Sequence, residues 1–212
     1  MLCLAAAADA APPVLRAVRA PGLDAGAAWS DRDGWKNVPT AALRGVDRAD
    51  AQGAAVKARW NEEAVFFEFV CRDTSIVSPG ERDGLDHFRL GDVVEVFLGR
   101  AGAKDYAEVH ATPAGRKTLY FFRGYRRAAP PPDAADAIAV RAEPIRDGWR
   151  AVLVIPWAAL GTDGTAGRWE VLAGRYDYAV AGGRPVLSSF PVQSSPPDFH
   201  ARDRYARLVL EP

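Results

Sequence analysis

Two glutamates and a histidine occupy alternate positions in two neighbouring segments of mixed polarity. Segment 92–98 reads DVVEVFL and contains Glu95, and segment 105–111 reads DYAEVHA and contains Glu108 and His110. Carboxylates and imidazoles exchange protons, bind metal ions and accept hydrogen bonds from hydroxyl groups. Because side chains along a strand alternate between its two faces, Glu108 and His110 share one face, opposite the apolar positions of their segment.

The linker between these segments, GRAGAK, is short and contains glycine, so it predicts a β-hairpin. The apolar faces of the two strands must coincide, since a shift of one residue would turn every side chain to the other face. We expect the register to form the pairs Val94–Val109, Val96–Ala107, Glu95–Glu108, Phe97–Tyr106 and Val93–His110.

Two carboxylates directly opposite each other repel, so the expected pairing of Glu95 with Glu108 needs an offsetting group. An arginine, a calcium ion or the hydroxyl groups of a bound sugar would each serve. Two alternatives stay open. Both carboxylates face water, or the register differs by two residues and Glu95 pairs with His110.

A carboxylate pair about 5 Å apart also matches the separation found in retaining glycosidases. A glycosidase, however, needs a deep cleft and two acids with well-separated pKa values, and the sequence supplies no second domain to form one. Glycoside hydrolysis by Glu95 and Glu108 is therefore the first alternative to ligand binding without catalysis.

The rest of the chain shows the same alternation of apolar and polar residues, which predicts strands rather than helices. Many short strands punctuated by turn residues indicate an all-β sandwich or barrel. The expected strands are 14–20, 54–60, 64–71, 92–98, 105–111, 116–123, 137–143, 148–155, 168–180 and 204–210.

Helix is expected only as short turns. Proline suits the first position of a helix, so residues 156–160 are expected to form one turn, and residues 39–44 another. Tryptophans within strand patterns belong to the core more often than to a binding surface. We expect core positions for Trp60, Trp149 and Trp169, a position closing one end of the sandwich for Trp157, and exposed loop positions for Trp29 and Trp35.

Composition argues against several functional classes. The 212 residues include 27 basic and 27 acidic side chains, so the net charge is zero. The sequence therefore lacks the excess of basic residues that is typical of nucleic-acid binders. No apolar stretch approaches the roughly 20 residues that a membrane helix needs. We expect a monomer with no nucleic-acid partner and no membrane span.

The first residues, MLCLAAAADAAPP, resemble the end of a signal peptide, with a small-x-small cleavage site at residues 8–10. We expect residues 1–13 to be a signal-peptide remnant or a flexible tail, residues 14–212 to form the domain, and the protein to be secreted or periplasmic. Cys3 lies in this leader and Cys71 at a buried strand position, so no disulfide framework is expected.

Six segments, in order, resemble a family 9 carbohydrate-binding module over about residues 14–212. They are VKARWNEEAVFFEFVCRD, GDVVEVFL, DYAEVHATPAG, GWRAVLVIPWAAL, RYDYAV with the following VLSS, and PPDFHARDRYARLVL. The resemblance implies an antiparallel β-sandwich with jelly-roll-like topology that binds glycan chain ends or small oligosaccharides between aromatic side chains. It also implies a role in polysaccharide use, and structural calcium in some members.

Residue by residue, the resemblance places a sugar-bonding acid at Glu95 and polar sugar contacts at Glu108 and His110. Phe88 and Phe190 stand where relatives have stacking tryptophans, and phenylalanine offers a smaller apolar face without an N–H donor. Arg175, Tyr178, Ser189 and His200 fall in family-like segments, which leaves open whether each contacts ligand or scaffold. The expected ligand-binding set is Phe88, Glu95, Glu108, His110, Arg175, Tyr178, Ser189 and Phe190.

Two further alternatives remain. Similar sandwiches bind haem, which would need axial ligands from His87, His110 or His200. A structural sandwich without a ligand is the other. No cofactor is required for the expected binding function. Asp31, Asp33, Asp83 and Asp86 could hold a structural calcium ion, but their spacing is not that of an EF-hand, so we expect these side chains to be solvated.

Overall fold

Thirteen strands account for most of the regular structure in the computed structural model, which describes residues 11–46, 52–162, 164 and 167–212. The leader-like residues 1–10, with Cys3 and the cleavage motif, lie outside the described part of the chain. The strands are β1 (Val14–Arg19), β2 (Ala41–Gly45), β3 (Ala54–Trp60), β4 (Ala64–Arg72), β5 (Val93–Arg100), β6 (Asp105–Ala111), β7 (Lys117–Arg123), β8 (Ala128–Ala129), β9 (Ala139–Ile145), β10 (Gly148–Pro156), β11 (Trp169–Asp177), β12 (Val186–Phe190) and β13 (Ala206–Leu210).

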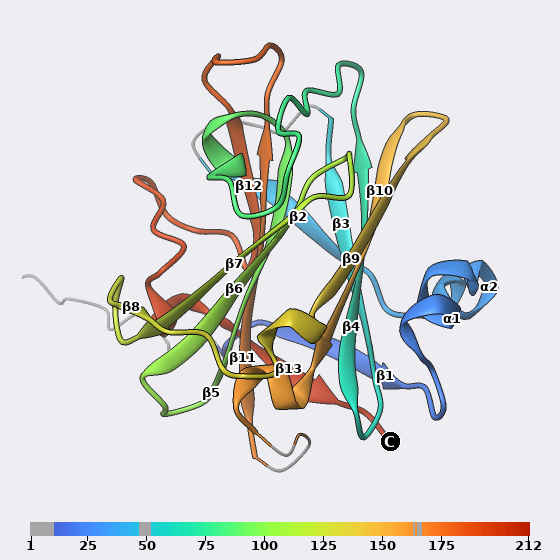
Figure 1. The fold of residues 1–212 in the computed structure, drawn as a ribbon, viewed down its shortest axis with the longest axis vertical. Coiled ribbons are helices and arrows are strands. Elements are labelled where there is room, and N and C mark those ends of the chain that lie inside the picture. The colour runs from blue at the N-terminus through green and yellow to red at the C-terminus, as the bar shows by residue number, and fades with distance from the viewer. Residues whose placement is uncertain (1–10, 47–51, 163, 165–166) are drawn as a thin grey trace, which may run out of the picture.

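The strands form the two layers of a β-sandwich (Figure 1). One layer has the order β9-β10-β4-β3 and the other the order β8-β7-β6-β5-β11, with antiparallel pairing throughout both. Two links join the layers: β12 pairs with β2 between β11 and β3, and β13 pairs with β1 in parallel. The predicted all-β sandwich is confirmed.

The main core lies between the layers and follows the period of two. Alternate residues of β4 and β10, such as Phe67, Phe69 and Leu153, face Val94 and Val96 of β5 and are wholly buried. Trp60, Trp149 and Trp169 belong to this core as predicted, and so does Cys71. Trp157 begins a one-turn 3₁₀ helix, Trp157–Leu160, which confirms the turn expected after Pro156.

The register of the β5–β6 hairpin differs by two residues from the one that we expected first. Glu95 lies opposite His110, not Glu108, and Val96 lies opposite Val109. Strand β5 ends at Arg100 and strand β6 begins at Asp105, so residues 101–104 form the turn. Gly102 makes this tighter turn possible because it adopts a positive φ of 79°. A register shift of two residues leaves every side chain of the hairpin on the sheet face that the sequence predicts.

Two short helices cover the outer face of β4 and β10, where we expected an exposed loop. Helices α1 (Ala25–Ser30) and α2 (Arg32–Lys36) are each capped by an aspartate side chain, from Asp24 and Asp31. Trp35, expected to be exposed, is buried and donates a hydrogen bond from Nε1 to the carbonyl oxygen of Ala28 at 2.9 Å. The two Asp caps were the available sequence signal for these helices.

Residues 39–44 were expected to form a helical turn, and most of them instead belong to strand β2. Strand β2 pairs with β3 and with β12, so its backbone hydrogen-bonding groups are satisfied by two neighbours. Pairing with distant strands therefore overrode the local helical preference of this segment.

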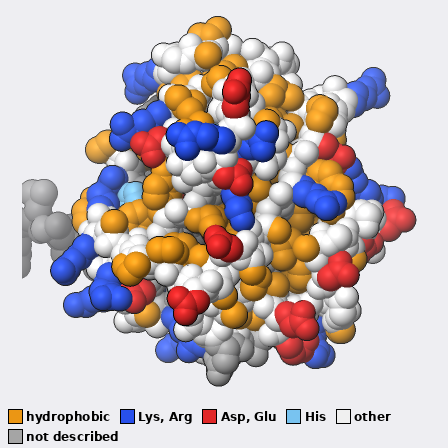
Figure 2. Space-filling view, viewed as in Figure 1, with side chains coloured by type: hydrophobic (Ala, Val, Ile, Leu, Met, Phe, Trp, Pro, Cys, Tyr) orange, Lys and Arg blue, Asp and Glu red, His pale blue; other side chains and the backbone are white. Residues whose placement is uncertain are grey.

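No helix in the described ranges is long and apolar enough to cross a membrane. On the face shown in Figure 2, acidic and basic side chains are interspersed with apolar ones rather than gathered by sign, in keeping with the balanced composition.

A buried ion pair fastens the two helices to the sheet. Arg150 donates from Nε to Glu68 Oε1 at 2.6 Å and from Nη1 to the carbonyl oxygen of Trp29 at 3.1 Å. Its guanidinium also lies over the Trp29 ring, 4.9 Å from the centroid. Both charged side chains are almost fully buried, and each has one further charged neighbour, Glu143 at 3.6 Å from Arg150 and Lys57 at 3.9 Å from Glu68.

Glu68→Ala is expected to lower the free energy of unfolding by about 3 kcal/mol, because it removes the nearer of the two carboxylates beside the buried Arg150 charge and leaves only Glu143 at 3.6 Å. Urea unfolding followed by circular dichroism measures this loss. A double variant, Glu68→Leu with Arg150→Met, removes both charges and should recover most of the stability. A single variant within about 1 kcal/mol of the parent, as for an exposed pair, would contradict the assignment.

Candidate functional site

The predicted acidic and imidazole side chains come together on the outer face of the β5–β6–β11 layer. A cavity of about 190 Å³ opens there. It is lined by Phe88, Arg89, Glu95, Phe97, Glu108, Arg126, Tyr176, Leu187, Pro197, Phe199 and His200. A larger hollow of about 700 Å³ elsewhere is bordered by Pro130–Pro132 and Trp169 and contains none of the predicted ligand-binding residues. The chemistry therefore concentrates in the smaller cavity.

Glu95, Glu108 and His110 form a buried cluster at the floor of this cavity. His110 Nε2 lies 2.5 Å from Glu108 Oε1 and 3.1 Å from Glu95 Oε1. The imidazole is fully buried, and Glu95 and Glu108 are 1% and 6% exposed. The cross-strand position of His110 opposite Glu95, and its position two residues from Glu108 on the same face, place one nitrogen against both carboxylates.

Burial raises the pKa of the Glu95 carboxyl to about 8, because the surrounding side chains exclude the water that would solvate its charge. The nearby charge of Glu108 adds to this rise, and His110 offsets part of it. Burial by itself would lower the pKa of His110, but Glu95 and the hydrogen-bonded Glu108 outweigh it and hold that pKa above its usual value. The pKa values of Glu95 and His110 are therefore both raised, the first by burial and the second by its two carboxylate neighbours.

His200 and Tyr106 extend the polar floor on the side of Glu108. His200 Nε2 lies 3.9 Å from Glu108 Oε2, and its Nδ1 is 2.9 Å from the hydroxyl oxygen of Tyr106. Burial lowers the pKa of His200, and the charge of Glu108 works against this effect. A half-buried imidazole therefore faces the cavity beside a carboxylate.

Aromatic rings form the walls of the cavity over Glu95 and Glu108. Phe88 packs edge-on against Tyr176 with ring centroids 5.8 Å apart, and Phe97 packs edge-on against Phe199 at 6.0 Å. Tyr178 fixes Phe88 by donating a hydrogen bond from its hydroxyl to the Phe88 carbonyl oxygen at 2.7 Å. The cavity thus has apolar walls above a charged floor.

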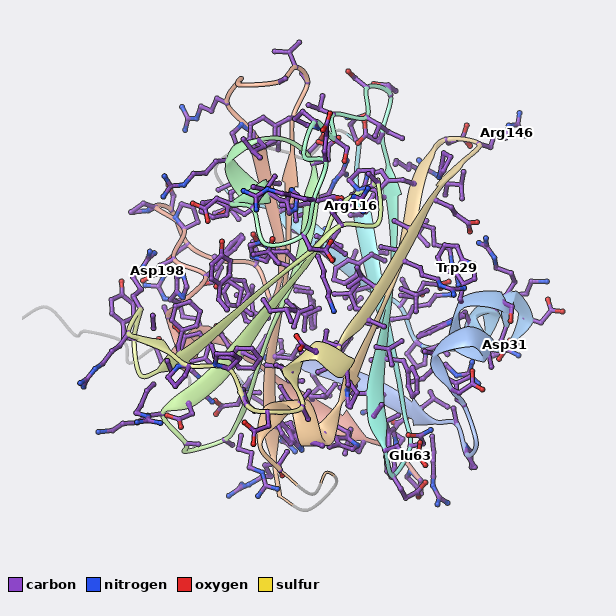
Figure 3. All side chains as sticks on the ribbon, in the orientation of Figure 1. Trp29, Asp31, Glu63, Arg116, Arg146 and Asp198 are labelled. Carbon is purple, nitrogen blue, oxygen red and sulfur yellow. The ribbon has the colours of Figure 1, made fainter. Side chains whose placement is uncertain are left out.

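The segment that follows β12 closes the cavity on one side. Asp198 anchors it by accepting hydrogen bonds from the hydroxyl of Tyr125 at 2.8 Å and from Arg126 at 3.0 Å. Figure 3 shows Asp198 on the side of β7 and β8, far from the α1–α2 side of the molecule. Gly174 permits the close approach of this segment, since a Cβ there would lie 2.8 Å from the Phe199 ring.

The predicted ligand-binding set divides into three groups. Phe88, Glu95 and Glu108 line the cavity, and His110 lies directly behind the two carboxylates. Tyr178 supports the wall through Phe88 without lining the cavity. The third group lies elsewhere, and consists of Arg175, Ser189 and Phe190.

Strand parity explains Arg175 and Phe190, which follow the inner face, whereas Ser189 is engaged by the backbone after its strand. Arg175 lies opposite Val94 on the inner face of β11, is fully buried, and donates to Asp73 Oδ2 at 3.2 Å. Phe190 packs against the main core. Ser189 is buried and donates from its hydroxyl to the Pro191 carbonyl oxygen at 2.9 Å.

Sequence reasoning left His200 open and missed the other cavity residues as site residues, namely Arg89, Phe97, Arg126, Tyr176, Leu187, Pro197 and Phe199. Tyr176 had a usable signal, because it lies two positions from Gly174, which pairs with Glu95. Arg126 and Phe199 lie in irregular segments, where no periodicity indicates a facing direction.

The acidic residues proposed for calcium do not form one group. Asp31 pairs with Arg59 at 2.7 Å beside the helices, whereas Asp86 accepts a hydrogen bond from Tyr120 on β7 at 2.5 Å. Asp33 pairs with Lys36, and Asp83 accepts from the backbone N–H of Lys117. These four residues therefore do not provide a shared calcium site.

A different set, Asp73, Asp92 and Asp177, does bring three carboxylates together within 4.8 Å. Arg175 already lies among them, 3.2 Å from Asp73 and 3.4 Å from Asp177. Both oxygens of Asp92 accept backbone N–H groups, from Val77 and Tyr178. A guanidinium and backbone N–H donors thus already engage the carboxylates of this set.

The pKa of Glu95 predicts a pH dependence of stability. Between about 4.5 and about 8, the unfolded chain releases the Glu95 proton while the native chain retains it. The free energy of unfolding should therefore fall as pH rises through this window, and Glu95→Gln should remove that part of the fall. Urea unfolding at several pH values in the presence of a chelator measures the difference, with the exposed Glu63→Gln as control. If the free energy of unfolding changes with pH in the same way for the parent and for Glu95→Gln, the assigned pKa of Glu95 is contradicted.

Comparison with known proteins supports the fold at low sequence identity. No protein-family model and no curated protein sequence matches the chain. Among solved structures, a protein of Bacteroides uniformis provisionally described as carbohydrate-binding matches with a TM-score of 0.75 at 17% identity, over 94% of this chain and 99% of the other.

Two structures of a family 9 carbohydrate-binding module from Caldicellulosiruptor kristjanssonii also match. The complex with cellotriose has a TM-score of 0.69 at 14% identity, over 93% of each chain. The complex with glucose has a TM-score of 0.71 at 14% identity, over 93% of this chain and 95% of the other. The chain is therefore a domain with the fold of the family 9 carbohydrate-binding modules.

Proposed function

We propose that this domain binds carbohydrate without catalysis, and that the cavity over Glu95 and Glu108 takes a single sugar ring, such as the end of a glycan chain. The observation that carries the proposal is the composition of the cavity, in which carboxyl, guanidinium and imidazole groups converge beneath aromatic walls. Few placed polar groups within an apolar lining are typical of small-molecule sites. Sugar complexes of proteins with the same fold are consistent with it.

The polar groups suit hydroxyl ligands. With its raised pKa, Glu95 retains a proton at neutral pH, so its carboxyl group can donate one hydrogen bond and accept others. A sugar hydroxyl has the same double capacity. Arg126, held in place by Asp198, supplies further donors at the rim. The rings of Phe88 and Tyr176 offer apolar surface for the C–H face of a sugar.

The size of the cavity limits the ligand. Pockets for drug-sized molecules usually span about 300–1,000 Å³, whereas this cavity has about 190 Å³. One ring, with the remainder of a chain extending into solvent, fits this volume better than a buried oligosaccharide. The proposal therefore favours chain ends or small sugars over the middle of a long chain.

The position of His110 argues against a glycosidase. In a retaining enzyme, the sugar's anomeric carbon must lie between the two carboxylates. Here the His110 Nε2 atom lies between them, 2.5 Å from one and 3.1 Å from the other. Haem binding is disfavoured as well, because His87 and His110 are buried among other side chains and His200 lies within 2.9 Å of the Tyr106 hydroxyl and 3.9 Å of Glu108.

We further infer that the domain acts as a monomer outside the cytoplasm, in a system that uses polysaccharides. Support comes from the leader-like first residues and from the ligand class. Its balanced charge gives no basis for a nucleic-acid partner. Calcium is not needed for the proposed binding, because protein donors already occupy the gathered aspartates.

Isothermal titration with glucose, cellotriose and a panel of other mono- and oligosaccharides tests the proposal. The parent should bind at least one of them, and Glu95→Leu should weaken that binding about 10- to 100-fold, because a buried sugar hydroxyl then loses its hydrogen-bond partner. Glu63→Leu, at the β3–β4 turn far from Asp198 in Figure 3, is the matched control and should bind as the parent does.

Two different results would contradict two different parts of the proposal. If no sugar in the panel binds a folded parent protein, the domain is a structural sandwich and the proposal fails. If the parent hydrolyses glycosides and Glu108→Gln abolishes the turnover, the non-catalytic assignment fails instead.

A further inference from the structure

We propose that Glu95, Glu108 and His110 also form a binding site for one divalent transition-metal ion, such as Zn²⁺, at the floor of the cavity. The three side chains offer one imidazole nitrogen and two carboxylate oxygens, and these ligand atoms all lie within 4.8 Å of one another. This proposal goes beyond carbohydrate binding and stands whether or not a sugar binds.

The spacing of the ligand atoms suits a small ion. With Zn–N and Zn–O bonds of about 2.0–2.2 Å in tetrahedral geometry, neighbouring ligand atoms lie roughly 3.3 Å apart. His110 Nε2 is 3.1 Å from Glu95 Oε1, close to this value, and 2.5 Å from Glu108 Oε1. The shorter separation is that of a hydrogen bond, and it would lengthen by less than an ångström when an ion replaces the shared proton.

Glu95 is a buried carboxyl group whose ion-pair contact is with a nitrogen that Glu108 also shares. It is 1% exposed and lines the cavity, yet its contact of hydrogen-bond length is with His110 Nε2. That nitrogen carries at most one hydrogen, and it lies nearer to Glu108, at 2.5 Å, than to Glu95. A buried carboxylate with so little donation from the protein needs a proton or a cation.

Neighbouring cations are engaged elsewhere. Arg126 pairs with Asp198 at 3.0 Å, and Arg89 lies 3.6 Å from Asp86. This arrangement contrasts with the set of Asp73, Asp92 and Asp177, where Arg175 already lies among the carboxylates. Of these two acidic clusters, the cavity cluster is the one whose charge no guanidinium neutralises directly.

The ligand types select the class of ion. Calcium prefers six to eight oxygen ligands, whereas imidazole favours zinc and neighbouring first-row metals. Three protein ligands leave at least one coordination position, as in open zinc sites. That position faces the cavity, because Glu95 and Glu108 line it and His110 lies behind them.

Metal titration of the full, tag-free chain after chelator treatment tests the proposal without any sugar. Co²⁺ should produce visible d–d absorption that saturates at one equivalent, and calorimetry should show one Zn²⁺ site. Ca²⁺ should bind much more weakly. Zn²⁺ should also raise the thermal unfolding midpoint, as expected for a ligand that binds the native state.

Glu95→Gln and Glu108→Gln keep the side-chain shape and should each weaken Zn²⁺ binding at least tenfold, while Glu63→Gln should not. Circular dichroism confirms that each variant is folded before titration. The proposal is overturned if the parent gives no Co²⁺ absorption and no Zn²⁺ heat, if both glutamine variants bind Zn²⁺ like the parent, or if Ca²⁺ binds as tightly as Zn²⁺. Because no sugar is present, a negative result leaves the carbohydrate proposal standing, and a failure of sugar binding leaves this one standing.

Discussion

The contact of His110 with both Glu95 and Glu108 is the interaction on which the candidate site depends. It holds two acidic side chains together in a region from which water is largely excluded, where each alone would be costly to bury. The hairpin register produces this contact by placing His110 opposite Glu95 and two residues from Glu108. A one-residue slip would turn the cluster into the core and the core valines into the cavity.

The surrounding structure preserves this arrangement from several directions. Tyr178 holds the Phe88 wall, and Asp198 holds the segment that carries Phe199 and His200 over the sheet. Gly174 leaves room for that segment beside Glu95. The site is therefore built on one rigid sheet face, with irregular segments supplying the rim, as is common where a scaffold positions functional loops.

The sequence predicted the parts of the structure that depend on the alternation of apolar and polar residues along a strand. The hairpin faces, the buried tryptophans of the strands and the meeting of Glu95, Glu108 and His110 all follow from a period of two. The register expected first was wrong, and the alternative that pairs Glu95 with His110 is the one observed. Alternation could not choose between them, because both registers put the same residues on the same faces, and they differ only at the turn, where Gly102 has a positive φ.

Other features depended on contacts distant in sequence. Strand β2 forms because β3 and β12 pair with it, and α1 and α2 form against the outer sheet face around Trp35. Arg175 could not be assigned from a motif alone, since its partner Asp73 lies on another layer of the sandwich. Arg126 and Phe199 lie in irregular segments, where no sequence periodicity predicts which side chains face the cavity.

Chemical-shift mapping of the backbone amides during titration with the sugar panel tests the central claim most directly. We expect the perturbed amides to cluster around Phe88, along the outward positions of β5 and β6, and at residues 197–200. Perturbation confined to the larger hollow around Pro130–Pro132 and Trp169, with the residues around Glu95 and His110 unchanged, would contradict the account.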